Sequence, residues 1–195
     1  RLVRLGPALD EVIERHGYPL AVARPLAESM VLCAMLATSL KYDGIFTLQI
    51  SGDGPIKLLV TDLTSDGALR GYAQFDSWKL AIALGSGKED APDGYVPKLF
   101  GQGRLTFTVD QGQHTERYQG VVPIDGHGLE AATHQYFAQS EQIPTRIRLA
   151  VGEIAAPGGS AWRAGGRPGV CVERDLMCRP PGGGRAVLNA VAMRS

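Results

Sequence analysis

The chain has 195 residues, of which 44% are hydrophobic, and its 20 basic and 20 acidic side chains cancel to a net charge of zero. This length and composition are typical of a soluble globular protein with one domain and at most a small appendage. The balanced charge argues against a dedicated nucleic-acid-binding protein. The longest apolar stretch, residues 25–40, is interrupted by Glu28 and Ser29, so we expect no membrane-spanning segment.

Two helices are predicted in the first forty residues. Pro7 suits a first helical turn and Gly17 suits a helix end, which predicts a short helix over residues 7–15. A longer helix with one apolar stripe follows, and Pro25 is expected to mark its true start or a kink. The stripe consists of Pro19, Ala23, Leu26, Met30, Cys33, Ala37 and Leu40. We expect it to pack in the core, with Cys33 as a buried thiol.

From residue 44 the apolar pattern changes to period two, which predicts strands. A hairpin is expected over residues 46–60 and a third strand over residues 68–74. Leu105, Phe107 and Val109 are predicted to pair with Tyr118, Gly120 and Val122. These strands would form an antiparallel meander. Residues 85–97 are polar and glycine-rich, which is typical of a mobile loop.

A last helix and strand are predicted around a junction without glycine. Leu129, Ala132, Thr133, Tyr136 and Phe137 fall at helical spacing, and Pro144 forbids further helix. Beyond it, Ile147, Leu149 and Val151 alternate with Arg146, Arg148 and Ala150, which predicts a half-buried strand. The predicted fold class is therefore α+β, with an antiparallel sheet covered by helices.

The composition changes near residue 155. Residues 156–195 are rich in glycine, proline and arginine, which is typical of low complexity or disorder. We therefore predict a folded domain over residues 1–155 and a divergent tail over residues 156–195. The first residues show no leader of charged and then apolar residues, so a cytoplasmic location is expected.

Two features with a possible chemical role are better explained as turns. Residues 85–88 resemble the end of a phosphate-binding loop, but Ile82 and Glu89 occupy the positions that need glycine and serine or threonine. The carboxylates near predicted turns are expected to cap backbone N–H groups, so none forms an acid and base pair. They are Asp53, Asp62, Asp66 and Asp76.

Two other groupings contain residue types found in enzymes. His127, Glu130 and His134 could share a helix face and bind a divalent metal, although a solvated polar face explains them without a metal. His134, Asp125 and Ser140 are the residue types of a nucleophilic triad, but no nucleophile elbow surrounds Ser140. We therefore expect no catalytic, cofactor-binding or metal-binding residues and no enzyme. A metal-dependent hydrolase using the first grouping is the less favoured alternative.

Five motifs together resemble a known family. They are LGPALDEVIERHGYP at 5–19, GDGPIKLLVTD at 52–62, GALRGYAQ at 67–74, RYQGVVPI at 117–124 and YFAQSEQIPTRI at 136–147. Their order over residues 1–166 is similar to that of the N-terminal domain of the redox-regulated chaperones called heat-shock protein 33.

The resemblance implies an ATP-independent holding chaperone that binds unfolding client proteins under oxidative and heat stress, as a cytoplasmic homodimer. It also implies a zinc module with one Cys-x-Cys and one Cys-x-x-Cys pair, whose oxidation forms disulfides and releases the metal. This sequence departs from that pattern, because Cys171 and Cys178 are seven apart and no second pair exists. We therefore expect no cofactor in this chain. A non-catalytic interaction or dimerisation domain is the alternative function.

Overall fold

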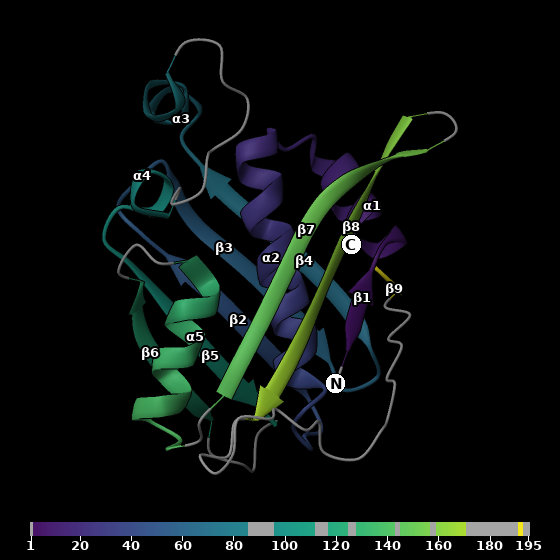
Figure 1. The fold of residues 1–195 in the computed structure, drawn as a ribbon, viewed down its shortest axis with the longest axis vertical. Helices are drawn as coiled ribbons and strands as arrows, with labels where there is room; N and C mark the ends of the chain where they lie inside the picture. Colours follow the sequence, from purple (N-terminus) through teal and green to yellow (C-terminus); the bar gives the residue numbers. More distant parts are fainter. Residues whose placement is uncertain are drawn as a thin grey trace.

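A computed structural model describes residues 2–85, 96–111, 117–124, 128–142, 145–156, 159–170 and 191–192, with the backbone alone for residues 96–97 and from residue 153 onward. The fold is α+β, as predicted, with a large sheet, a smaller sheet and helices (Figure 1). The helices are α1 (Pro7–His16), α2 (Leu20–Ala37), α3 (Ser77–Leu84), α4 (Val96–Phe100) and α5 (Gly128–Gln139). The strands are β1 (Val3–Leu5), β2 (Ile45–Ser51), β3 (Ile56–Thr64), β4 (Ala68–Phe75), β5 (Gly103–Asp110), β6 (Tyr118–Ile124), β7 (Thr145–Ala156), β8 (Gly159–Val170) and β9 (Val191–Ala192).

The large sheet has the strand order β6-β5-β2-β3-β4-β9. The predicted pairings of β2 with β3 and of β5 with β6 are confirmed, including Phe107 opposite Gly120. The predicted meander is wrong, because β5 pairs with β2 and not with β4. The chain therefore returns from β4 to the opposite edge of the sheet before β5 begins. At the edge of β4, the Tyr18 hydroxyl accepts a hydrogen bond from the N–H of Ala73 at 2.9 Å.

Helix α2 is buried on all sides rather than along one stripe. It packs on β3 and β4 of the large sheet and, on its other side, on β7 and β8, which cross it in Figure 1. It begins at Leu20, so Pro25 lies inside the helix and does not mark its start. Leu40 lies beyond the helix and is 49% exposed. A helix enclosed between two layers must be apolar all round, and a single stripe would not suffice.

The same enclosure explains the hydropathy of α2. Its 18 residues have a mean hydropathy of 1.6 and are long enough to cross a membrane, but 83% of them are buried inside the fold. Core helices between two sheets meet the same criteria of length and composition. Cys33 is fully buried on this helix, as predicted.

Helix α1 is confirmed, and Gly17 ends it in the left-handed conformation with φ of 59°. Helix α3 was not predicted. It begins after Asp76, whose carboxylate caps the N–H groups of Trp78 and Lys79 at 3.0 Å. This confirms the capping role expected of Asp76. The loop predicted over residues 85–97 lies outside the described residues except for Gly85 and the start of α4.

Helix α5 and strand β7 are confirmed on either side of the predicted junction. The helix ends at Gln139, before the proline, and Gln142 adopts φ of 53°, which turns the chain without a glycine. In β7, Ile147 is fully buried and Leu149 is half-buried, while Arg146 and Arg148 are exposed. The expected alternation along this strand is therefore present.

The smaller sheet has the order β1-β8-β7. Strand β8 pairs with β7 from Ala156 opposite Gly159 to Thr145 opposite Val170, and with β1 at residues 164–166. The boundary predicted at residue 155 lies within this hairpin. Most of the remaining tail, with Cys171 and Cys178, lies outside the described residues.

Candidate functional site

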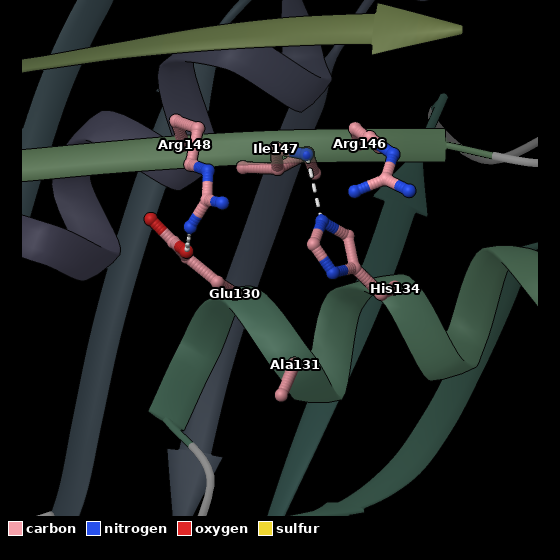
Figure 2. A pocket seen from close by; sticks show the side chains of 6 residues that line it. All are labelled: Glu130, Ala131, His134, Arg146, Ile147 and Arg148. Atoms are coloured by element: carbon pink, nitrogen blue, oxygen red, sulfur yellow. Dashed lines mark hydrogen bonds and ion pairs between the residues drawn. The ribbon is translucent and has the colours of Figure 1, made fainter. Parts of the chain in front are cut away.

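The pocket between α5 and β7 contains two of the residues predicted as possible metal ligands. It has a volume of about 280 Å³ and is lined by Glu130, Ala131, His134, Arg146, Ile147 and Arg148 (Figure 2). The His134 imidazole accepts a hydrogen bond at Nε2 from the N–H of Ile147 at 2.7 Å. The Glu130 carboxylate accepts another from the N–H of Leu149 at 2.5 Å, and Arg148 approaches the same carboxylate at 3.5 Å.

The spacing of these residues explains why two side chains of α5 reach two backbone N–H groups of β7. Glu130 and His134 are four apart, so their side chains lie on one face of α5 about 6 Å apart. Ile147 and Leu149 are two apart on β7, so their N–H groups leave the same edge of the strand at nearly the same separation. The other edge of β7 pairs with β8. Two helical side chains therefore take the place of a neighbouring strand.

This arrangement corrects the expectation of a solvated polar face for Glu130 and His134. Both side chains are occupied as acceptors for the backbone of β7. The third proposed ligand, His127, lies outside the described residues, as does Asp125 of the proposed triad. Ser140 is exposed, and its N–H donates to the carbonyl of Tyr136. Within the described part of the chain no three His, Cys, Asp or Glu side chains gather as in a metal site.

A second polar cluster lies at the junction itself. The hydroxyls of Tyr118 and Tyr136 are 2.5 Å apart, and both tyrosines donate to the Glu141 carboxylate. These bonds to Tyr118 and then Tyr136 hold the pKa of Glu141 below its usual range. Burial, with the Tyr118 and Glu141 contacts, raises the pKa of Tyr136. The cluster ties β6 to the end of α5, and sequence reasoning missed it because Tyr118 is distant along the chain from Tyr136 and Glu141.

We expect Tyr136→Phe to destabilise the protein by about 1 kcal/mol at neutral pH, because the half-exposed Glu141 loses one donor. The pKa of Glu141 is lowered in the folded state, so its contribution is present at neutral pH and is lost as pH falls through that lowered pKa. The stability difference should therefore shrink in acid. Urea unfolding at several pH values measures it.

Tyr42→Phe is the control for this experiment. The Tyr42 hydroxyl donates to the carbonyl of Leu63 at 2.9 Å, and a carbonyl does not titrate. Its stability cost should change little over the same pH range. A Tyr136→Phe cost that stays constant down to acidic pH would show that the hydroxyl does not act through Glu141.

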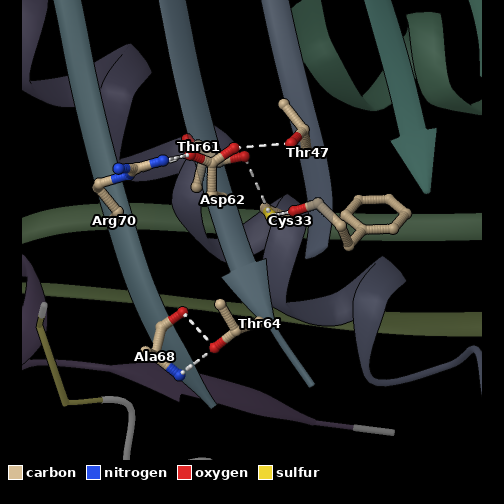
Figure 3. Close-up of polar contacts among 8 residues, drawn as sticks. Cys33, Thr47, Thr61, Asp62, Thr64, Ala68 and Arg70 are labelled. Carbon is tan, nitrogen blue, oxygen red and sulfur yellow. Dashed lines mark hydrogen bonds and ion pairs between the residues drawn. The ribbon is translucent and has the colours of Figure 1, made fainter. Parts of the chain in front are cut away.

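A polar row crosses the middle of the large sheet (Figure 3). The Asp62 carboxylate accepts a hydrogen bond from Thr47 at 2.7 Å and pairs with Arg70, each on a neighbouring strand. Asp62 thus joins three strands and does not cap a turn, which corrects the sequence interpretation. Behind the row, the Cys33 thiol lies 3.6 Å from the carbonyl of Thr61, and burial raises the pKa of that thiol. A thiol held neutral in the core is unreactive.

The face of the large sheet opposite α2, here called the outer face, is the other candidate surface. Figure 1 shows α1, α2, α5 and the β7–β8 hairpin together on one side of this sheet. The outer face consists of Gln119, Val121 and Pro123, Arg104, Thr106 and Thr108, Thr47, Gln49 and Ser51, Leu58, Val60 and Asp62, and Arg70, Tyr72 and Gln74. Most of its side chains are exposed or half-buried, and Asp62 is the buried exception.

The outer face combines apolar and uncharged polar side chains with the charged Arg104, Asp62 and Arg70. Val60 lies opposite Tyr72 across the strand pair, and Leu58 is next to Val60 on the same face of β3. Tyr72 is 47% exposed, and Val121 on β6 is 54% exposed. Threonine and glutamine side chains fill the space between these apolar groups. A partly apolar face that no described element covers is typical of a surface that binds other proteins.

Comparison with known proteins agrees with this architecture. The family model described as Hsp33 protein matches residues 1–166. A 33 kDa chaperonin of Caulobacter vibrioides is 46% identical over 170 residues, covering 85% of this chain and 54% of the relative. One from Shewanella loihica is 38% identical over 149 residues, covering 76% and 48%. The chain thus spans about half the length of the curated relatives it matches.

A solved structure gives the same result. The crystal structure of the 33 kDa chaperonin (heat shock protein 33 homolog) from Thermotoga maritima superposes with a TM-score of 0.60 at 26% identity, covering 81% of this chain and 52% of that one. The motifs at the junction, the strand order and these matches agree, and the chain belongs to the Hsp33 family.

Proposed function

We propose that this chain is the client-binding domain of an ATP-independent holding chaperone. The name 33 kDa chaperonin, carried by a relative that is 46% identical, supports a chaperone. The outer face carries the proposal, because holding an unfolding protein requires accessible apolar surface on a stable scaffold. Leu58, Val60 and Tyr72 provide such a surface on strands whose opposite face is fixed against α2.

The finer features of the proposal rest on the family resemblance. We propose that the chain acts on unfolded clients in the cytoplasm, as a homodimer, under oxidative and heat stress. Redox control would belong to the zinc module of the longer relatives. Structural zinc sites use four ligands. The sequence holds three cysteines, and Cys33 is enclosed in the core, so these residues do not fit such a site.

Two other functions remain as alternatives. A non-catalytic interaction or dimerisation domain would use the same outer face for a folded partner. A metal-dependent hydrolase is less favoured, because Glu130 and His134 would have to give up their bonds to β7 before they could bind a metal. Metal analysis of the purified chain tests the hydrolase directly.

The outer face is tested by the double variant Val60→Ser and Tyr72→Ser. We expect it to lose most of the ability to prevent aggregation of heat-unfolded citrate synthase, because the apolar pair that would contact the client is gone. The intact chain should suppress aggregation without ATP and equally in reducing and oxidising buffer. Light scattering at several ratios of chain to client measures this.

The matched control is Trp78→Ser with Ile82→Ser on α3. These side chains are 75% and 60% exposed, so the control removes more exposed apolar surface than the test variant does, at a different place. Circular dichroism should show both double variants folded. Equal loss of suppression in both variants would show that the outer face is not the specific client surface, and no suppression by the intact chain would favour the interaction domain.

A further inference from the structure

The side of the smaller sheet that faces away from α2 carries an arginine at several positions. Val3, Leu5 and Ile147 are buried, so the residues that alternate with them on β1 and β7 lie on this outward side. Residues paired directly across antiparallel strands share a face, so the register extends the outward side onto β8. The arginine positions, here called the arginine face, are Arg4 on β1, Arg146 and Arg148 on β7, and Arg163 and Arg167 on β8.

The register places the members of the arginine face close to one another. Arg167 is directly opposite Arg148, and Arg4 is opposite Gly165, which is two residues from both Arg163 and Arg167. Neighbouring strands are about 4.8 Å apart, and residues two apart on one strand are separated by about 7 Å. The arginine face therefore concentrates positive charge within three strands.

The arginine face is open to solvent. The side chains of Arg4, Arg146 and Arg148 are exposed. Figure 1 shows β7 and β8 in front of α2, with no described helix or strand drawn over them. The other outward positions of the three strands are mostly glycine and alanine, such as Ala150 and Gly165. Small residues between the arginines let a large partner approach the sheet closely.

Little negative charge offsets these arginines. None of the outward positions of β1, β7 and β8 is Asp or Glu. The carboxylate beside the face is Glu130 of α5, which already accepts the N–H of Leu149. Its ion pair with Arg148 is long, at 3.5 Å, and leaves the Arg148 side chain 82% exposed. An anionic partner would therefore complement the charge of this face.

The arrangement fits phosphates of a nucleic acid better than carboxylates of a protein. A guanidinium binds either group through two parallel hydrogen bonds. A protein segment offers carboxylates only where it holds Asp or Glu, whereas a nucleic acid carries a negative charge at every nucleotide. None of the outward positions is aromatic, so contacts would be made to phosphates and not by base stacking. A flexible single strand can follow the sheet, while a rigid duplex would touch it along a narrow line.

We propose that the arginine face binds single-stranded nucleic acid through its phosphates, without sequence preference. The zero net charge of the chain argues against a broad basic surface, and the arginine face is a local one whose charge is offset elsewhere. Helix α2 lies between the smaller sheet and the large sheet, so the arginine face and the outer face lie on opposite sides of the molecule. Binding there leaves the outer face accessible to a client. The proposal goes beyond the holding function and does not depend on it.

Fluorescence anisotropy with the full 195-residue chain tests the site. The probe is a labelled oligouridine of about 16 nucleotides. We expect its affinity to fall about a hundredfold between about 50 and 200 mM salt, because about five phosphate contacts give a slope near −3.5 of log affinity against log salt. A duplex of the same length and a glutamate polymer of the same charge should compete clearly less well. Equal competition by either, or no binding at the lower salt concentration, would overturn the proposal.

Arg146→Gln with Arg148→Gln is the test variant, and circular dichroism should show it folded. We expect it to bind the oligouridine about tenfold or more weakly and to reduce the salt slope by about 1.4, which is about 0.7 for each lost phosphate contact. The matched control is Arg104→Gln with Arg117→Gln, which changes the net charge equally at exposed positions of the large sheet. It should bind as the unmodified chain does. Equal weakening in both variants would show a general attraction of charge and no specific face.

A second measurement locates the site without any variant. The amide NMR signals of the unmodified chain are followed while the same oligouridine is added. The signals of Arg4, Arg146 and Arg148 should shift, while those of Val60 and Tyr72 on the outer face should stay in place. Shifts confined to the outer face would mean that the nucleic acid binds the proposed client surface instead, and would refute the assignment to the smaller sheet.

Discussion

Ile147→Ala is expected to cost about 2 to 5 kcal/mol of unfolding free energy, because it removes a fully buried branched side chain and leaves a cavity. Its position increases the effect. Ile147 lies on β7, which closes the core over α2, so the surroundings are fixed by the large sheet on the other side of that helix. Chemical denaturation with a two-state fit measures the change.

Two further alanine variants show whether burial causes this effect. Leu149→Ala, two residues along the same strand, should cost clearly less, since Leu149 is only half-buried. Val121→Ala on the outer face should stay within about 0.5 kcal/mol of the unmodified chain, as is usual for exposed positions. Equal costs for Ile147 and Leu149 would contradict the described position of β7.

Gly120→Ala should destabilise the protein by about 1 to 3 kcal/mol through overpacking. A Cβ atom at this position of β6 would lie 2.4 Å from the ring of Tyr136 and 2.6 Å from its hydroxyl. The ring cannot simply move aside, because its hydroxyl donates to Glu141 and lies against the hydroxyl of Tyr118. The variant must therefore either loosen the packing of α5 on β6 or break the hydrogen bonds among Tyr118, Tyr136 and Glu141. Thermal and urea unfolding measure its cost.

A double-mutant cycle identifies the cause. In a Tyr136→Leu background the clash is smaller, so the additional cost of Gly120→Ala should fall by more than about 0.5 kcal/mol, the level at which residues count as coupled. Gly152→Ala on β7 is the control, because a Cβ there would meet no atom within 4 Å. If Gly120→Ala costs the same with and without Tyr136, the destabilisation arises in the backbone of β6 and not from a clash with the tyrosine ring.

The local sequence pattern was sufficient to predict a structural feature where the residues involved have a single physical explanation. The helix ending at Gly17, the hairpin between β2 and β3, and the alternation of Ile147 with Arg146 and Arg148 follow from backbone geometry and from which side of an element is buried. These features involve neighbours within a few residues. The sequence alone therefore predicted the main helices, most strands and the α+β class.

Strand order and the sites depended on contacts between distant parts of the chain. Nothing in the spacing of β4 and β5 indicates that β5 joins β2 at the other edge, because the strand pattern describes a face and not a partner. The stripe predicted on α2 became burial on all sides only because β7 and β8 cover its second face. Periodicity detects one buried face and cannot count the layers around a helix.

The polar residues show most clearly which features follow from the sequence pattern and which depend on tertiary contacts. Glu130 and His134 at a spacing of four are compatible with a solvated face or a metal site, and the sequence interpretation, which favoured the solvated face, did not include a strand edge. Only the tertiary structure brings the N–H groups of Ile147 and Leu149 to them. The sequence by itself determined the main helices, most of the strands and the family motifs that they carry. Partners of polar side chains were decided by the tertiary structure, because a hydrogen bond depends on position in space, which residues distant in sequence share only after folding.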